Sequence, residues 1–214
     1  MSLEKCDRAF SEHYPSRIYS GNRFFGVVRA KMGLRIYGNR QLKTLPGQMT
    51  RPTPARVREA LFNIWQGDVV GCRWLDLCAG SGVMGAEALC RGAIAAVGIE
   101  QSGRACAIVR DNWRQVATPE QSWRVIQGDV AQRLRSLAGQ QFDRIYFDPP
   151  YASDLYQPVL GAIAQHQLLA AGGELAVEHS PQRQDFQASS GLVVCRVKLY
   201  GNTALTFFQN PETP

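Results

Sequence analysis

The segment from Phe142 to Tyr151 constrains the fold of this chain more than any other, because an apolar run ends there in a carboxylate, two prolines and an aromatic ring. Residues 145–147 are typical of a buried strand in a parallel sheet. The strand must end at Asp148, since proline has no amide N–H and a fixed φ. Ligands of open α/β sheets bind just beyond the carboxyl ends of the strands, so we expect Asp148 and Tyr151 at the functional edge. The simpler alternative is that Asp148 caps the next helix and Tyr151 packs in the core.

From residue 72 onward, segments with strand character alternate with segments with helix character. We expect strands at 74–78, 95–100, 124–127, 142–147, 174–178, 192–200 and 204–209, and helices from 86 onward and at 102–115, 130–138 and 153–170. This alternation predicts an α/β fold with a doubly wound, mostly parallel seven-stranded sheet. The turn signal Gly201-Asn202 predicts a closing hairpin, which places an antiparallel strand at the edge of the sheet.

Composition and cysteine usage indicate an ordinary soluble protein. Apolar residues make up 45% of the 214, enough for a substantial core, and no apolar run approaches the roughly 18 to 20 residues of a membrane span. The first ten residues alternate charges where a secretion signal would be apolar, so we expect a cytoplasmic protein. The six cysteines lack C-x-x-C spacing and the three histidines are scattered, which argues against a metal site and a disulfide framework.

The net charge of +6 is concentrated near the N-terminus. Residues 1–65 contain 12 Lys/Arg and 4 Asp/Glu, a net +8, whereas residues 66–214 contain 12 and 14, a net −2. Such a concentration is expected for a protein that binds RNA or DNA, although a solvated basic tail would have the same composition.

These patterns predict three regions. Residues 1–32 follow no periodicity, and we expect an N-terminal extension that need not be ordered. Residues 33–66 predict a small basic hairpin, turning at Gly38-Asn39, and a helix from Pro54 to about Gln66. Residues 67–214 supply the sheet. On the predicted helix, Arg56 and Arg58 lie off the apolar stripe, which leaves them either solvated or in contact with phosphate.

A glycine-rich motif follows the first strand of the sheet. Gly80 to Gly85 match G-x-G-x-x-G between a strand and a helix, and Glu100 ends the next strand. In this fingerprint the glycines let the backbone approach a ligand and the acid binds ribose hydroxyls. This motif alone predicts that the protein binds either NAD or S-adenosylmethionine. Asp76 favours the latter, since a carboxylate suits an ammonium better than a pyrophosphate, but it could equally accept a backbone N–H of the loop.

Together, Asp76 to Gly85 and Asp148-Pro149-Pro150-Tyr151 resemble the Rossmann-like class I methyltransferases that use S-adenosylmethionine to modify exocyclic amines of bases. The block from Leu34 to Asn63, which includes Arg51-Pro-Thr-Pro, resembles one branch of them, the bacterial 16S ribosomal RNA guanine-N2 methyltransferases that modify guanine 966. The resemblance runs from about Leu34 to Phe208. The family often has Phe at the position of Tyr151, a change that keeps the stacking ring.

The resemblance implies roles for individual residues. Asp148 and the Pro149 carbonyl would hold the guanine amine, Pro150 would stiffen the loop, and Tyr151 would stack on the extruded base. The implied cofactor-binding residues are Asp76, Ala79, Gly80, Gly82, Gly85, Glu100, Gln101, Asp129 and Val130, and the implied RNA-binding residues are Arg35, Arg40, Lys43, Arg51 and Arg56. Two alternatives stay open: Asp129 could instead cap the following helix, and Glu178 could face the cleft or pair with an arginine.

The resemblance therefore implies a monomeric rRNA methyltransferase whose 67–214 region binds S-adenosylmethionine, without a metal, and whose partner is 16S rRNA or a partly assembled small subunit. Three alternatives remain. A DNA adenine-N6 methyltransferase would normally need a target-reading domain, for which the sheet leaves no room. An NAD-dependent oxidoreductase is disfavoured by Asp76 and Asp148. An RNA-binding assembly factor without catalysis would share the basic N-terminal region.

Overall fold

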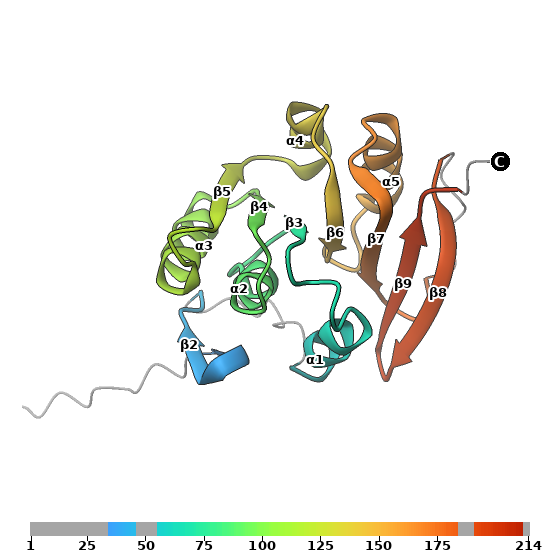
Figure 1. Cartoon of the computed structure of the whole chain (residues 1–214). Helices are drawn as coiled ribbons and strands as arrows, with labels where there is room; N and C mark the ends of the chain where they lie inside the picture. Colours follow the sequence, from blue (N-terminus) through green and yellow to red (C-terminus); the bar gives the residue numbers. More distant parts are fainter. Residues whose placement is uncertain (1–33, 46–54, 184–190, 212–214) are drawn as a thin grey trace, which may run out of the picture. The chain divides into compact units, whose positions relative to one another are not determined.

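Residues 33–214 form one compact unit in a computed structural model of the chain, which describes residues 34–45, 55–183 and 191–211. Its seven-stranded sheet consists of β3 (Arg73–Leu77), β4 (Ala95–Glu100), β5 (Ser122–Gln127), β6 (Phe142–Phe147), β7 (Leu169–His179), β8 (Val193–Tyr200) and β9 (Thr203–Gln209). Figure 1 shows the strands in the order β5-β4-β3-β6-β7-β9-β8. The expected seven-stranded α/β fold is confirmed.

The closing hairpin lies at the edge of the sheet, as expected. The strands β3 to β7 are parallel, and β9 is antiparallel to both of its neighbours, β7 and β8. The antiparallel strand β9 therefore lies one place inside the sheet, and β8 forms the edge. The burial of the two strands explains this order, because β9 is buried along almost its whole length and β8 is mostly exposed. An apolar strand is stable only where both of its faces are covered.

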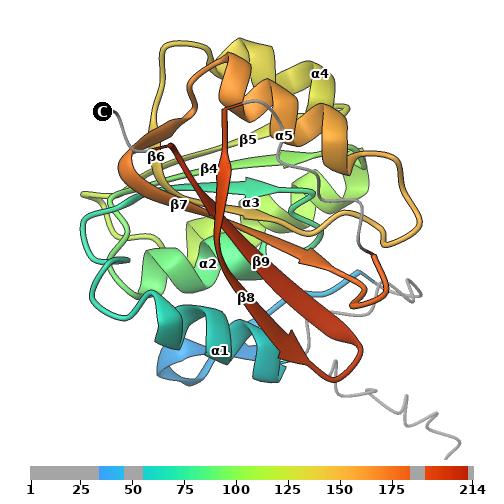
Figure 2. The same ribbon diagram turned by 90° about the vertical axis from the view of Figure 1, so that its right-hand side faces the viewer.

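Helices cover both faces of the sheet, as expected of a doubly wound fold. One face carries α1 (Ala55–Ile64), α2 (Val83–Cys90) and α3 (Gly103–Val116), and the other carries α4 (Val130–Leu134), η2 (Arg135–Leu137) and α5 (Tyr156–Gln165) (Figures 1 and 2). Alternate strand residues enter two separate cores, for example Trp74 and Tyr146 on the first face and Leu75 and Phe147 on the second. No helix in the described part of the chain is long and apolar enough to cross a membrane.

The predicted basic hairpin is present. It consists of β1 (Leu34–Ile36), a turn η1 (Tyr37–Asn39) and β2 (Arg40–Leu42). Ile36 and Leu42 are buried in the same core as α1 and the first face of the sheet. Residues 33–66 and 67–214 therefore share a core. The boundary between them separates two expected roles and does not separate two packed units.

The helix α1 is held to its surroundings by a buried ion pair. Arg58 Nε lies 2.7 Å from Glu87 Oε2 of α2, and both side chains are almost completely buried. Arg58 also donates to the carbonyl oxygen of Arg35 at 2.9 Å, and Arg91 donates to Glu87 Oε1 at 2.8 Å. Both interpretations of Arg58 from the sequence are therefore wrong, because this arginine is neither solvated nor accessible to a phosphate.

The helix expected at 153–170 is much shorter than predicted. It occupies Tyr156–Gln165, and Gln167 turns the chain with a φ of 51°. Strand β7 then begins at Leu169, five residues before the expected strand start, and the Phe142 N–H donates to the Leu168 carbonyl at 2.8 Å. The buried run 168–170 suits either a helix end or a strand start, so periodicity alone could not decide between them.

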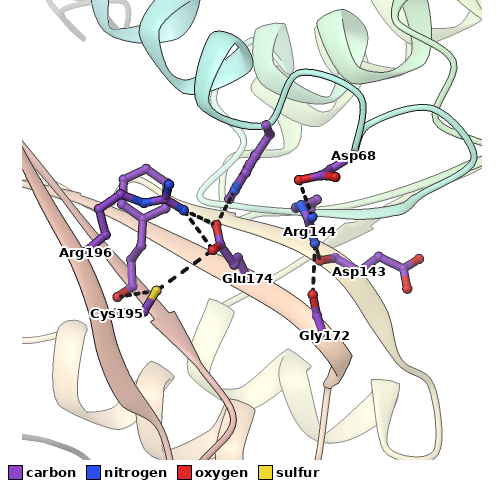
Figure 3. Close-up of polar contacts among 9 residues, drawn as sticks. Asp68, Asp143, Arg144, Gly172, Glu174, Cys195 and Arg196 are labelled. Atoms are coloured by element: carbon purple, nitrogen blue, oxygen red, sulfur yellow. Dashed lines mark hydrogen bonds and ion pairs between the residues drawn. The ribbon is translucent and has the colours of Figure 1, made fainter.

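Polar contacts join β6 and β7 to the loop after α1, and β8 to β7 (Figure 3). Glu174 of β7 accepts from Trp65 Nε1 at 2.6 Å and from Arg196 of β8 at 2.8 Å. Arg144 of β6 lies 2.8 Å from Asp68. These contacts are at the end of the sheet opposite to Asp148.

A tryptophan of α3 packs against glycines of α2 and β4. A Cβ added to Gly85 would lie 2.2 Å from Trp113 Cζ2, and one added to Gly98 would lie 2.9 Å from Trp113 Cη2. Trp113 Nε1 donates to the Gly82 carbonyl at 2.7 Å. The absence of side chains at these positions lets α2 and α3 approach each other and the sheet.

We predict that Gly85→Ala destabilises the protein by at least about 1–3 kcal/mol, because the new methyl group overlaps a fully buried indole. The matched control is Gly161→Ala in α5, where an added Cβ meets nothing within 4 Å. This control should gain about 0.5–1 kcal/mol from helix propensity. Urea unfolding of the two variants measures both changes, and equal effects would contradict the packing role assigned to Gly85.

Candidate active site

The carboxyl ends of four neighbouring strands bring acidic residues together around Cys78, which follows β3. The pKa of its thiol is raised by burial and, beyond that, by the carboxylates of Glu100, Asp148, Asp76 and Asp129. These four acids come from the ends of β3, β4, β5 and β6, or from the loops just beyond them. Asp76 keeps its proton near neutral pH, so the negative field comes from the carboxylates of Glu100, Asp148 and Asp129, and it suits a positively charged ligand.

The glycine-rich turn begins with two residues in the left-handed region, Cys78 with a φ of 61° and Gly80 with a φ of 57°. The Gly80 N–H donates to Glu100 Oε2 at 2.9 Å, which joins the turn to the end of β4. An added Cβ at Gly80 would meet only the Cys78 carbonyl oxygen, at 4.0 Å. The backbone at Gly80 therefore leaves room for a ligand to approach.

The other two glycines of the motif pack against α3. Added Cβ atoms at Gly82 and Gly85 would overlap side chains of α3, namely Val109 at 2.7 Å and Trp113 at 2.2 Å. Gly82 also has a φ of 72°, which an ordinary side chain rarely adopts. These two glycines are required for packing against α3.

Asp76 takes the alternative role that the sequence left open. It is almost completely buried, and its Oδ2 accepts from the Gly85 N–H at 2.9 Å. Burial raises the pKa of this carboxyl group to about 8, against the opposing effect of the Gly85 hydrogen bond. Asp76 thus connects β3 to the first turn of α2, below the glycine-rich turn.

The two acids at the ends of β4 and β5 order the loops that follow them. Glu100 Oε1 accepts from the Ser102 N–H at 2.8 Å, while its other oxygen holds Gly80. Asp129 caps α4 by accepting from the Gln132 N–H at 3.0 Å, so the capping alternative is confirmed. Of the remaining predicted cofactor residues, Ala79 and Val130 are buried and Gln101 is exposed.

The loop after β6 lies beside the glycine-rich turn. The strand ends at Phe147, as predicted, and the Asp148 N–H donates to the Leu77 carbonyl at 3.4 Å. Asp148 is partly exposed, Pro149 is buried and Pro150 is exposed. The helix α5 begins only at Tyr156, so the alternative that Asp148 caps it is wrong.

The aromatic residue of this loop is held by its hydroxyl group. Tyr151 Oη donates to Glu178 Oε1 at 3.0 Å and lies 3.0 Å from Thr203 Oγ1. Burial raises the pKa of Tyr151, so the phenol stays protonated. Glu178 is itself buried at the end of β7 and also accepts from the hydroxyl of Tyr146.

Sequence reasoning missed three residues that shape this site. Trp113 and Asn112 support the glycine-rich turn, and Asn112 Nδ2 donates to the Ser81 carbonyl at 2.8 Å. A signal for Asn112 existed, because it is a polar residue on the apolar stripe that Val109, Trp113 and Val116 form at helical spacing. No local pattern distinguishes Thr203, which reaches Tyr151 only through the strand order.

Three of the five basic residues predicted to bind RNA have partners within the chain. Arg35 donates to Asn39 at 2.6 Å, Arg40 donates to the Val116 carbonyl at 2.9 Å, and Lys43 lies 2.7 Å from Asp111. Arg56 is exposed on α1, and Arg51 lies outside the described residues. Arg40 therefore fixes the hairpin to α3, whereas the Lys43–Asp111 pair is solvent-exposed and easily exchanged. In the residues that the structure describes, no group of three or more His, Cys, Asp or Glu is placed to hold a metal ion.

The fold and this site define a class I methyltransferase. Residues 34–209 match the family described as Conserved hypothetical protein 95, and the chain belongs to that family. The match agrees with the range expected from the sequence.

Individual relatives have related names. The chain is 31% identical over 172 residues to the "Putative rRNA methyltransferase YlbH" of Bacillus subtilis, covering 79% of this chain and 93% of that protein. It is 27% identical to the "Ribosomal RNA small subunit methyltransferase D" of Escherichia coli, covering 82% and 89%. Among solved structures, the "Putative methyltransferase yhhF from Escherichia coli" matches with a TM-score of 0.72 at 27% identity, covering 85% and 99%.

We predict that the stability of the protein falls as the pH rises from about 4 to about 8 because of Asp76. In this window the unfolded chain ionises Asp76 while the folded chain, with its raised pKa, keeps the proton, which favours unfolding by up to ~1.4 kcal/mol per pH unit. Asp76→Asn keeps an oxygen for the Gly85 N–H and cannot ionise, so its stability should lack this fall. Urea unfolding at several pH values tests this, and parallel curves for the two proteins would show that Asp76 does not titrate in this way.

Proposed function

We propose that this protein transfers a methyl group from S-adenosylmethionine to the exocyclic N2 amine of a guanine in 16S ribosomal RNA, with guanine 966 as the expected position. One observation carries the proposal: the glycine-rich turn and the Asp148 loop meet at one edge of the sheet, where the Asp148 N–H donates to the Leu77 carbonyl at 3.4 Å. A cofactor at Gly80 and a base at Asp148 would therefore be neighbours. The names of the relatives from Bacillus subtilis and Escherichia coli support an rRNA substrate.

The residues at this edge fit S-adenosylmethionine. The cofactor carries a positively charged sulfur and an ammonium group, and the carboxylates of Glu100, Asp148 and Asp129 near Cys78 supply a field of the opposite sign. Gly80 leaves space for a ligand at the turn, and Glu100, at the end of β4, would accept hydrogen bonds from the ribose hydroxyls of the cofactor. The bound cofactor would supply an electrophilic methyl group.

The loop after β6 would orient the substrate amine. Asp148 offers carboxylate oxygens, and Pro149 offers a carbonyl oxygen on a backbone stiffened by two prolines. Hydrogen bonds from the two amine hydrogens to these acceptors would leave the nitrogen lone pair directed away from the loop. Orientation and proximity can supply about 7–11 kcal/mol of a barrier, so the reaction needs no strong base. The ring of Tyr151 would stack on the base after it leaves the RNA helix.

The described structure also bears on two alternative functions. An NAD-dependent oxidoreductase would place a pyrophosphate beside Glu100, where charge repulsion opposes it. A DNA adenine-N6 methyltransferase would use the same Asp148 loop, and substrate choice in the assay below separates it from the proposed enzyme.

We predict that Asp148→Asn lowers the rate of methyl transfer by about 100-fold or more, because an amide cannot accept from the amine as a carboxylate does. The affinity for S-adenosylmethionine should change little. The assay uses labelled cofactor and small-subunit particles that lack the modification, and the labelled base is then mapped. Transfer at the wild-type rate would refute the role of Asp148, and label in DNA but not in 16S rRNA would refute the choice of substrate.

We predict that Arg35→Gln and Lys43→Gln each weaken RNA binding and lower the slope of log K against log salt by about 1, because each would release one phosphate contact. The matched control is Arg124→Gln, an exposed arginine on β5 that pairs with Gln140 at 2.7 Å away from the hairpin. The test measures the RNA affinity of each variant and of the wild type at several salt concentrations. If the salt slope of all three variants equals that of the wild type, the hairpin does not hold the RNA.

A further inference from the structure

A buried acid lies directly behind the loop that carries Tyr151. Glu178, at the carboxyl end of β7, is 3% exposed. One of its carboxylate oxygens accepts from the hydroxyl of Tyr146, the other accepts from the hydroxyl of Tyr151 at 3.0 Å, and its backbone carbonyl accepts from Tyr156 at 3.3 Å. Three tyrosines of the β6 region thus converge on one residue of the neighbouring strand.

The hydroxyl of Tyr151 has a second partner on the other side. Thr203 Oγ1, from the first residue of β9, lies 3.0 Å away. A phenol has one proton to donate and can also accept, so it can donate to Glu178 while it accepts from Thr203. The end of the ring is held between β7 and β9, two strands that are paired in the sheet.

The ring is consequently fixed at both ends. Its Cα end belongs to the segment after two prolines, where the Ser153 N–H closes a turn onto the Pro150 carbonyl at 2.8 Å. Its hydroxyl end is fixed to Glu178 and Thr203. A ring held only by its backbone could tilt about χ1 and χ2, and the hydrogen bonds to the far end remove that freedom.

We propose that Glu178 is a positioning residue, which acts through the hydroxyl of Tyr151 to hold the aromatic ring in the orientation that stacks the target base beside Asp148. This inference rests on the proposed function, since it assigns Tyr151 to the substrate base. It goes beyond that function because a phenylalanine could stack equally well but could not be held in this way. Misplacement of a reacting group by about 1 Å can lower a rate by about 100-fold, so a modest tilt of the ring is enough to matter.

A purely structural role for Glu178 would have a different signature. In that case Glu178→Gln would lower the stability and the amount of active enzyme, but each folded molecule would transfer the methyl group at the normal rate. A positioning role instead lowers the single-turnover rate of correctly folded enzyme and leaves the cofactor affinity unchanged.

The experiment compares Glu178→Gln with Glu174→Gln in the full-length protein, with modification-deficient small-subunit particles as substrate. Glu174 is a matched control, because it lies on the same strand and face and also accepts from an aromatic side chain, Trp65 at 2.6 Å, but at the opposite end of the sheet (Figure 3). Glu178→Gln should lower the single-turnover rate by about tenfold, with less than about twofold change in the dissociation constant of S-adenosylmethionine. Glu174→Gln should lower the melting temperature and leave the rate unchanged.

A second variant keeps the test decisive if Glu178→Gln does not fold. Tyr151→Phe retains the ring and loses only the hydrogen bonds to Glu178 and Thr203, so it should also lower the single-turnover rate by about tenfold. Where both variants fold, the two effects should not multiply, because both remove the same contact.

Two results would overturn the inference: a wild-type rate for Tyr151→Phe, or rate losses that multiply in the double variant. Failure of the wild-type protein to methylate the particles would instead refute the proposed function, so the two failures are distinguishable.

Discussion

The packing of Trp113 against the three glycines Gly82, Gly85 and Gly98 is the contact on which the site depends. It places α2 and α3 close to the sheet, and the hydrogen bond from Nε1 to the Gly82 carbonyl, 2.7 Å long, holds the end of the glycine-rich turn. Its neighbour Asn112 extends the arrangement. This buried carboxamide donates to the Ser81 carbonyl at 2.8 Å and to the Lys43 carbonyl at 3.0 Å. The turn that would receive the cofactor and the end of the basic hairpin are thus held by adjacent residues of one helix.

Much of the fold could be predicted because its boundaries have strong local causes. The prolines end β6 at Phe147, the glycine-rich turn separates β3 from α2, and Gly201-Asn202 closes the last hairpin. The errors occur where local pattern permits two outcomes. The run 168–170 fits either a helix end or a strand start. The order of β8 and β9, for which the sequence made no prediction, depends on which strand can be buried on both faces, and this is a property of the assembled sheet.

The sequence predicted which acids gather at one edge of the sheet, but not which groups each of them contacts. The predicted strand ends identified the acids of the functional edge, because the carboxyl ends of parallel strands lie at the same edge of the sheet. From the sequence, Asp76 and Asp129 could each contact either the cofactor or a backbone N–H of the protein. The structure shows a backbone N–H partner for both residues. The pairing of Arg58 with Glu87 is tertiary and has no signal in either segment. The sequence therefore predicts which residues gather, whereas packing decides what each one contacts.

The distribution of charge also constrains how an RNA substrate could reach the acidic edge. Residues 1–65 have a net charge of +8, whereas the strand ends around Cys78 bring together the carboxylates of Glu100, Asp129 and Asp148. A phosphate would be attracted to the first region and repelled from the second. An uncharged base has no such penalty, and its amine hydrogens favour carboxylate acceptors. The same field that suits a cationic cofactor would thus exclude the RNA backbone and admit only an extruded base, as enzymes that act on bases within structured nucleic acid require.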